Sequence, residues 1–147
     1  PAVGLAQSAI ERHVWQEYRS FEPLSRTAAA ITGPIHLSSN PAFAAVGSRM
    51  SIAFGDGEPV ELVSVGASWR EWGLSGETRT AEVFQMHGDP GPVLAGNTLC
   101  GDPARYIVFS EDRLVGTSIL ELAVFTGAEA PSDINSPSLC DTFGYAY

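Results

Sequence analysis

The first hydrophobic pattern along the chain has the spacing of a helix. Four apolar residues follow one another at intervals of four, four and three positions: Ile10, Val14, Tyr18 and Phe21. This spacing places them on one face of an α-helix. Ser8 and Glu11 fit a capping box, in which each side chain accepts a hydrogen bond from the other residue's backbone amide. Pro23 should end the helix, so the pattern predicts an α-helix over residues 9–21 that packs on the rest of the domain through its apolar stripe.

After residue 30 the pattern changes to short segments rich in β-branched and aromatic residues, separated by clusters of Gly, Pro, Asp and Ser. It predicts seven strands, over residues 31–38, 49–54, 59–70, 79–87, 104–110, 118–126 and 142–147. Alternation is clearest in the second strand, where Met50, Ile52 and Phe54 share one face. The fifth and sixth strands are more continuously apolar, so we expect them to lie in the centre of the sheet.

The segments between the predicted strands favour antiparallel pairing. Gly55, Asp56 and Gly57 form a strong hairpin signal, and no connection has a helical pattern long enough for a parallel crossover. We therefore expect a mainly β domain: a barrel or sandwich of about seven antiparallel strands with one N-terminal α-helix. By analogy of architecture alone, such a domain is similar to lipocalin-like folds.

The length of 147 residues suits one domain, and a hydrophobic content of 44% is sufficient for a core. The first six residues, from Pro1 to Ala6, are small and apolar and resemble the end of a secretory signal peptide. We therefore expect residues 1–6 to be a signal-peptide remnant and residues 7–147 to form the domain. A frayed apolar terminus is the other interpretation of this segment.

The two cysteines agree with export. In an oxidising compartment Cys100 and Cys140 would form a disulfide, which would close a loop of about 40 residues and stabilise the domain by roughly 4 kcal/mol in the chain-entropy model. The bond would anchor the polar segment 127–140 and hold the last strand on the sheet. We expect a periplasmic or secreted protein, with two buried thiols in a cytosolic protein as the alternative.

The charge of the chain limits its partners. The chain has 17 acidic and eight basic residues, all of the latter arginine, for a net charge of −9. It lacks the basic surface that nucleic acid requires, whereas a cationic partner would suit it. No stretch reaches the roughly 18–20 apolar residues of a membrane span. We therefore expect no nucleic acid and no membrane span, and the sequence leaves the oligomeric state open.

The sequence has no motif for a metal or a cofactor, and we expect neither. His13 and Glu17 lie four positions apart on the predicted helix, but nothing near them completes a metal site, so an exposed ion pair is favoured. The acidic residues around the Gly57 turn lack the pattern of a calcium loop. His36 and His87 lie on predicted strands with no partner evident in the sequence.

The most suggestive segment for recognition is a pair of tryptophans around an Arg-Glu pair. Four residues form the candidate site for a ligand or partner: Trp69, Arg70, Glu71 and Trp72. Because side chains alternate along a strand, the two tryptophans should point to opposite sides. One should belong to the core, and the other should stand at a rim beside a charged neighbour, where it could bind a ligand or a protein. The plainer interpretation is that both indoles pack in the core or at an edge.

These observations favour a non-catalytic, extracytoplasmic binding module for a small apolar ligand or a protein partner. A closed barrel could hold the ligand in its mouth, whereas a filled interior would leave the loops and the Trp69–Trp72 rim to bind a protein. One alternative is a small hydrolase that uses His36 or His87 with a nearby acid, and a histidine within reach of both a serine and a carboxylate would favour it. The other is a structural subunit of a cell-envelope assembly, which a large apolar patch would favour.

Overall fold

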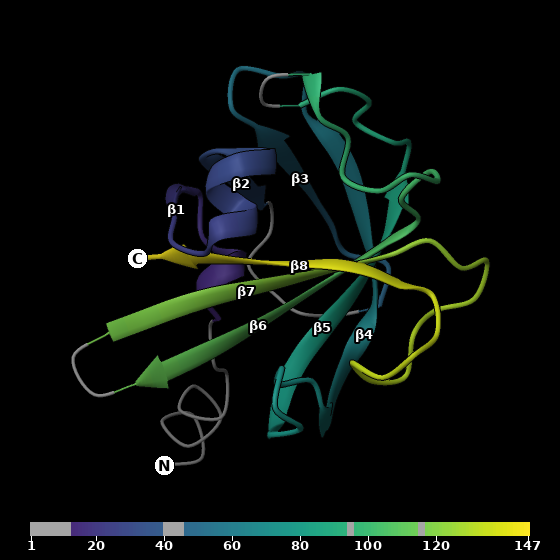
Figure 1. The fold of residues 1–147 in the computed structure, drawn as a ribbon. Coiled ribbons are helices and arrows are strands. Elements are labelled where there is room, and N and C mark those ends of the chain that lie inside the picture. Colours follow the sequence, from purple (N-terminus) through teal and green to yellow (C-terminus); the bar gives the residue numbers. More distant parts are fainter. Residues whose placement is uncertain (1–12, 40–45, 94–95, 115–116) are drawn as a thin grey trace, which may run out of the picture.

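Eight antiparallel strands form one closed barrel in the computed structural model, which describes residues 13–39, 46–93, 96–114 and 117–147 (Figure 1). The strands are β1 (Arg19–Pro23), β2 (Ile35–Ser39), β3 (Arg49–Phe54), β4 (Val60–Glu71), β5 (Thr78–His87), β6 (Tyr106–Leu114), β7 (Thr117–Phe125) and β8 (Leu139–Ala146). Each pairs with the next, and β1 also pairs with β8. The expectation of a mainly β, antiparallel domain is confirmed, with the sheet closed into a barrel. The expected signal-peptide remnant, residues 1–6, lies outside the described residues.

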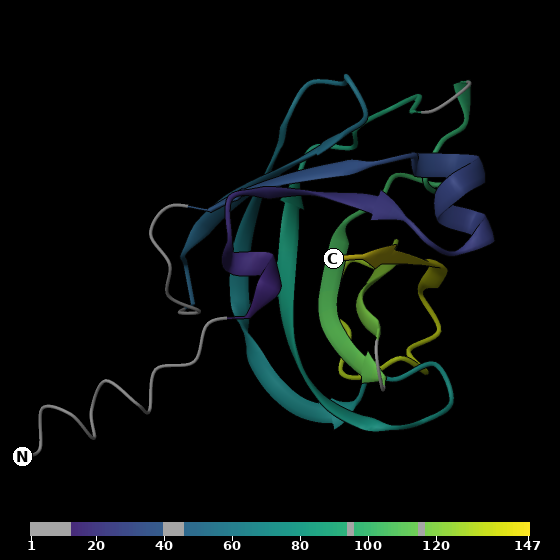
Figure 2. The ribbon, with the colours of Figure 1, turned by 90° about the vertical axis from the view of Figure 1, so that its left-hand side faces the viewer.

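The seven strands predicted from the sequence correspond to β2–β8. In β3, Met50, Ile52 and Phe54 are 6%, 0% and 4% exposed and belong to the main core, as their alternation predicts. The first predicted strand begins later than expected, at Ile35, because the residues before it form a short helical turn, η2 (Ala28–Thr32). Figure 2 shows β1 and β2 side by side, with η2 connecting them.

The prediction of an α-helix over residues 9–21 is wrong for residues 13–21, the part of this segment that the structure describes. Residues 9–12 lie outside this part, η1 (Val14–Gln16) is a single 3-10 turn, and β1 follows. Tyr18, which the helical stripe would bury, is 74% exposed, whereas Phe21 is 1% exposed and belongs to the core. The physical reason is tertiary: β1 supplies backbone partners to both β2 and β8, and without it the barrel would have two open edges.

Large side chains fill the inside of the barrel. Those with almost no exposure include Trp15, Phe21, Ile35, Leu37, Ile52, Leu62, Ile107, Phe109, Leu120, Phe143 and Tyr145. Trp15 lies between His13 and Phe109, with ring centroids 4.4 Å and 6.3 Å away. Its indole N–H donates to Oε1 of the buried Glu82 at 2.8 Å, and the Ser64 hydroxyl donates to Oε2 at 2.6 Å. The interior is therefore a packed core in which the buried Glu82 carboxylate is hydrogen-bonded.

A second hydrophobic cluster lies on the outer face of the barrel. Its buried members are Trp72, Ala81, Val83, Tyr106, Val108, Ala123, Phe125 and Ile134. Ile134 comes from the segment between β7 and β8, and its N–H donates to the backbone carbonyl of Glu71 at 3.1 Å. Successive residues of β6 and β7 thus contribute to different clusters. In β6, for example, Ile107 belongs to the barrel core and Val108 to the second cluster. This explains why both strands are largely apolar, since the inner face of each packs in the barrel core and part of the outer face packs in the second cluster.

The disulfide expected from the sequence is present. Cys100 lies in the long connection between β5 and β6, Cys140 lies in β8, and their Cα atoms are 5.9 Å apart. The bond therefore ties the end of the segment between β7 and β8 to a different connection of the barrel. No helix among the described residues is both long and apolar enough to cross a membrane.

Candidate functional site

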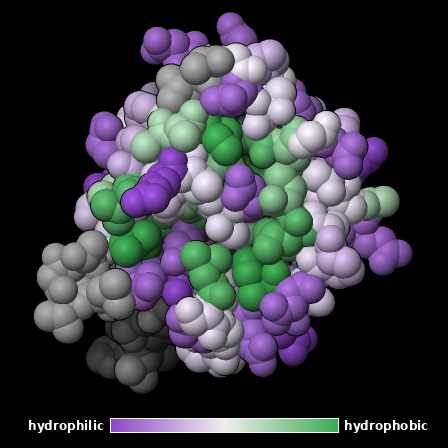
Figure 3. All heavy atoms as spheres, viewed as in Figure 1, coloured by the Kyte–Doolittle hydropathy of each residue, from purple (hydrophilic) through white to green (hydrophobic). Residues whose placement is uncertain are grey.

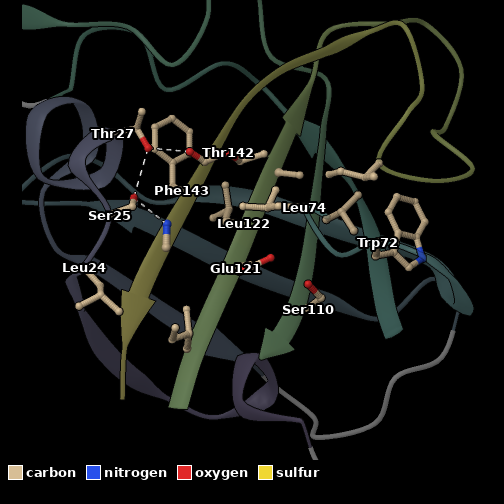
Figure 4. A pocket seen from close by; sticks show the side chains of 15 residues that line it. Leu24, Ser25, Thr27, Trp72, Leu74, Ser110, Glu121, Leu122, Thr142 and Phe143 are labelled. Atoms are coloured by element: carbon tan, nitrogen blue, oxygen red, sulfur yellow. Dashed lines mark hydrogen bonds between the residues drawn. The ribbon is translucent and has the colours of Figure 1, made fainter. Parts of the chain in front are cut away.

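An apolar groove lies on the outer face of β6, β7 and β8 and has a volume of about 300 Å³ (Figure 4). One end is formed by Leu24, Ser25 and Thr27, which follow β1, and the other by Trp72, Leu74 and Ile134. The strands cross the floor between these two ends. Figure 3 shows hydrophobic residues gathered around the middle of this face, with hydrophilic residues outside them. We call this feature the groove.

The groove exists because three residues of its floor have small side chains or none, whereas larger side chains lie around them. The outward-facing floor residues are Val108 and Ser110 of β6, Ile119, Glu121 and Ala123 of β7, and Thr142 and Gly144 of β8. Because residues alternate along each strand, the intervening Phe109 and Leu120 pack into the barrel core. The small residues Ser110, Ala123 and Gly144 leave a hollow at the level that larger side chains would occupy.

The Leu24 end of the groove is attached to β8 by several hydrogen bonds. Leu24 N–H and Ser25 N–H both donate to the Gly144 carbonyl, at 2.8 Å and 3.1 Å. Gly144 N–H donates in return to Ser25 Oγ at 2.9 Å, and the Thr27 hydroxyl donates to the Thr142 carbonyl at 2.7 Å (Figure 4). This end is therefore held in place by backbone and side-chain hydrogen bonds to β8.

The Trp72 end is built from the connection between β4 and β5 and from the segment before β8. Trp72 is 2% exposed, and its indole N–H donates to Ser68 Oγ at 3.2 Å. Ile134 packs in the same outer cluster, whereas Leu74 is 56% exposed and lies at the edge of the groove. Leu74 therefore adds to the apolar area at this end of the groove.

Glu121, on the floor of the groove, belongs to an ion-pair network around Arg79, which does not itself line the groove. The guanidinium contacts Glu121 Oε2 at 2.8 Å, Asp112 Oδ2 at 3.3 Å and Glu77 Oε2 at 3.9 Å. Burial raises the pKa of the Glu121 carboxyl; Arg79 opposes this shift, and the charges of Asp112 and Glu77 add to it. Backbone hydrogen bonds from Glu77 itself and from Ser75 lower the pKa of Glu77. Three carboxylates share one guanidinium, so the network is negative overall.

The structure does not bring the four predicted site residues together. Trp72 lines the groove, but Trp69 is 66% exposed and lines a separate hollow with His13 and Glu111. Arg70 borders another depression on the outside of β4, and Glu71 is exposed. Trp72 is thus packed and Trp69 is exposed, and they belong to different surfaces because side chains alternate along β4 and the residue that follows it.

Sequence reasoning missed most of the groove, including Glu121, Ser110 and both leucines at its edges. One signal was available: Glu121 is a single carboxylate within the otherwise apolar run 119–125. A charged residue in such a strand needs a partner or a function. The two ends come from segments about 50 residues apart in the chain. No local pattern indicates that these segments lie on either side of the same three strands, β8, β7 and β6.

The histidines form pairs rather than triads in the contacts that the structure describes. His36 Nδ1 lies 2.9 Å from Ser20 Oγ and its ring meets Tyr18 edge-on, with no carboxylate among these contacts. His87 lies 3.5 Å from a Glu61 oxygen, with no serine. The expected pairing of His13 with Glu17 is wrong, because the helix that would align them is absent.

The partners of these two residues lie elsewhere. His13 lies 3.8 Å from Glu111, and Glu17 pairs with Arg19 at 3.1 Å. Among the described residues, no three His, Cys, Asp or Glu side chains gather as metal ligands.

Comparison of the chain with protein-family models, with curated proteins and with solved structures finds no match. The function is therefore argued from the geometry of the groove.

Proposed function

We propose that the protein is a non-catalytic, extracytoplasmic binding module, and that its groove holds a small, mainly apolar ligand. The observation that carries the proposal is the groove itself: a hollow of about 300 Å³ with apolar ends, a floor of small residues and one polar side. Small-molecule sites are usually concave and mostly apolar with a few polar groups, and this volume is at the lower end of their range.

The ligand would lie on the outside of the barrel, and not in its mouth as the sequence suggested. Inside the barrel, Trp15, Phe109 and Tyr145 have almost no exposure and occupy the space that a ligand would need. The groove offers apolar surface without disturbing that core. The Leu24 end is hydrogen-bonded to β8 and the Trp72 end is packed, so the site is largely formed in advance.

One observation supports a location outside the cytoplasm. The Cys100–Cys140 disulfide is typical of oxidising compartments. We propose a periplasmic or secreted protein on this ground. Mass spectrometry of protein purified from its own host would test this by showing whether the disulfide forms there.

Titration with the neutral apolar dye N-phenyl-1-naphthylamine tests the groove. The dye should show a saturable rise in fluorescence with the wild-type protein. Leu74→Asp places a charge at the edge of the groove and should weaken dye binding about fivefold or more. Val46→Asp is the matched control, since Val46 is 75% exposed and does not line the groove. Equal dye affinity in both variants would contradict the proposal.

A small hydrolase is the second candidate, and the contact between Ser20 Oγ and His36 Nδ1 is the observation that favours it. Covalent labelling of Ser20 by a fluorophosphonate, lost in His36→Ala, would support this function. Absence of labelling would argue against a nucleophilic serine in the pair.

A further inference from the structure

The groove has one charged residue, and its charge is only partly compensated. Among the described residues that line the groove, Glu121 alone is charged, and its side chain is 16% exposed. Its Oε2 atom accepts a hydrogen bond from Arg79 at 2.8 Å, whereas none of the described hydrogen bonds goes to Oε1. Figure 4 shows Glu121 beside Ser110, between the Leu24 end and the Trp72 end. A ligand in the groove would therefore lie directly against this carboxylate.

Arg79 does not neutralise this side of the groove. It also contacts Asp112 and Glu77, so its single positive charge faces three carboxylates. Burial raises the pKa of Glu121, and the charges of Asp112 and Glu77 raise it further against the effect of Arg79. A second positive charge near Glu121 would relieve this repulsion and favour the ionised carboxylate.

The charge of the ligand follows from what binding would do to Glu121. A neutral ligand without a donor would remove water from the carboxylate and return no partner, which is unfavourable, and a neutral alcohol would return a hydrogen bond but no compensating charge. An anionic ligand would add repulsion to a network that is already negative. A protonated amine would donate a charge-assisted hydrogen bond to the carboxylate while its apolar body covers the floor.

We propose that the groove binds a small amphipathic amine, with the ammonium group on Glu121 and the apolar body between Leu24 and Trp72. This inference rests on the proposed ligand-binding function and specifies the chemistry of the ligand. The expected ligand is an amine with one apolar chain or ring, small enough for a hollow of about 300 Å³.

Competition against the bound dye tests the amine with three molecules of equal chain length: n-octylamine, 1-octanol and octanoate. Octylamine should displace the dye from the wild-type protein at about a tenfold lower concentration than octanol, because a hydrogen bond to a charged group adds about that much affinity. Octanoate should be the weakest. In Glu121→Gln the octanol concentration that displaces the dye, divided by the octylamine concentration that does so, should fall to near one.

Two further variants separate the effect of Glu121 from general effects of charge and stability. Glu61→Gln is the matched control, because Glu61 is also paired with an arginine, Arg49 at 2.8 Å, but lies outside the groove; the ratio should not change. Asp112→Asn leaves Glu121 in place and should lower the ratio only partly. It keeps the test informative if Glu121→Gln fails to fold, which its circular dichroism spectrum would reveal.

The outcomes distinguish this inference from the proposed function. Dye binding that depends on Leu74, together with equal displacement by octylamine and octanol, would overturn the amine and leave the groove as an apolar site. Displacement of the dye by octanoate at the lowest concentration of the three would overturn the amine proposal, and would indicate that the ligand pairs with Arg79. A wild-type protein that binds neither the dye nor octylamine would overturn both. Displacement by a lysine-containing peptide but by none of the octyl compounds would favour a protein partner instead.

Discussion

Individual buried polar residues show how the barrel places polar groups in an apolar core. Tyr145 is fully buried in β8, and its hydroxyl lies 2.6 Å from Thr32 Oγ1. Thr32 in turn lies within hydrogen-bond distance of the carbonyls of Ala28 and Gly33. The hydroxyl pair therefore ties β8 to η2 through groups that are fully satisfied, which is the condition under which buried polar atoms are tolerated.

Replacement of Tyr145 by Phe should lower the free energy of unfolding by about 1 kcal/mol at pH 7, the usual net value of one hydrogen bond. Urea denaturation at pH 7 checks this. Tyr18→Phe is the control, because Tyr18 is 74% exposed, and its unfolding free energy should stay within about 0.5 kcal/mol of wild type. A loss of stability as large in Tyr18→Phe as in Tyr145→Phe would contradict the role given to the buried hydroxyl.

The same hydroxyl should make the stability of the protein depend on alkaline pH. Burial raises the pKa of Tyr145 above its ordinary value of 10.0, so the unfolded chain loses this proton first. The contribution of the neutral tyrosine is present below pH 10 and is lost as pH rises towards the folded-state pKa, by about 1.4 kcal/mol at pH 11. Urea denaturation from pH 8 to 11 should show the gap between wild type and Tyr145→Phe narrowing or reversing. A constant gap would argue against the shift.

At the scale of elements, β1 decides the closure of the barrel. The segment over residues 13–23 has apolar residues at helical spacing, yet it forms a turn and then a strand, because β2 and β8 each present an edge that β1 can pair with. Intrinsic helix preference amounts to only a few tenths of a kcal/mol per residue. Backbone pairing on two sides, together with burial of Phe21, outweighs it.

Alanine substitutions at Phe21 and Tyr18 separate the strand from the helix. A helix would place both residues on one buried stripe, whereas in the strand only Phe21 is buried. Phe21→Ala should therefore cost about 3–5 kcal/mol in unfolding free energy, and Tyr18→Ala should cost less than about 1 kcal/mol. Urea denaturation of both variants measures the difference. Similar large costs at the two positions would restore the helical interpretation.

The disulfide belongs to the same scale, since it joins the connection between β5 and β6 to β8. The double variant Cys100→Ser and Cys140→Ser removes the constraint on a loop with a sequence separation of 40 residues. Its unfolding free energy should fall by roughly 4 kcal/mol in the chain-entropy model. Urea denaturation of the oxidised wild type and the double variant checks this. A difference below about 1 kcal/mol would mean that the end of β8 is held mainly by its neighbours.

The whole molecule combines a filled barrel with a binding surface on its outside. The interior is occupied by aromatic and aliphatic side chains, and a second cluster under the segment between β7 and β8 covers part of the outer face. The groove lies where this cover ends, between Ile134 and Leu24. The whole chain carries a net charge of −9, which favours the approach of cations over that of anions.

Salt should therefore weaken amine binding but not alcohol binding. Because charges are screened more strongly as ionic strength rises, the octylamine concentration needed to displace half of the dye should rise about threefold between 20 and 300 mM salt. The value for octanol should stay constant or fall slightly. Dye competition at the two salt concentrations measures both. Parallel changes for amine and alcohol would indicate that charge does not contribute to binding.

What the sequence determined on its own is what local chemistry decides. Period-two alternation placed Met50, Ile52 and Phe54 on one face, which the structure buries, the apolar runs of β6 and β7 indicated strands, and the two cysteines indicated their own bond. These features depend on neighbouring residues or on a single pair. They can therefore be recognised without knowing where the rest of the chain lies.

Only the tertiary structure decided the secondary structure of residues 13–23 and the position of the groove. The edges that make β1 a strand come from β2 and β8, and the hollow arises because Leu24 on one side and Trp72 and Ile134 on the other flank three other strands. The ion-pair network likewise joins Glu121 of β7 to Arg79 of β5 across β6. Such features depend on contacts between distant segments, and those contacts are created only when the barrel closes.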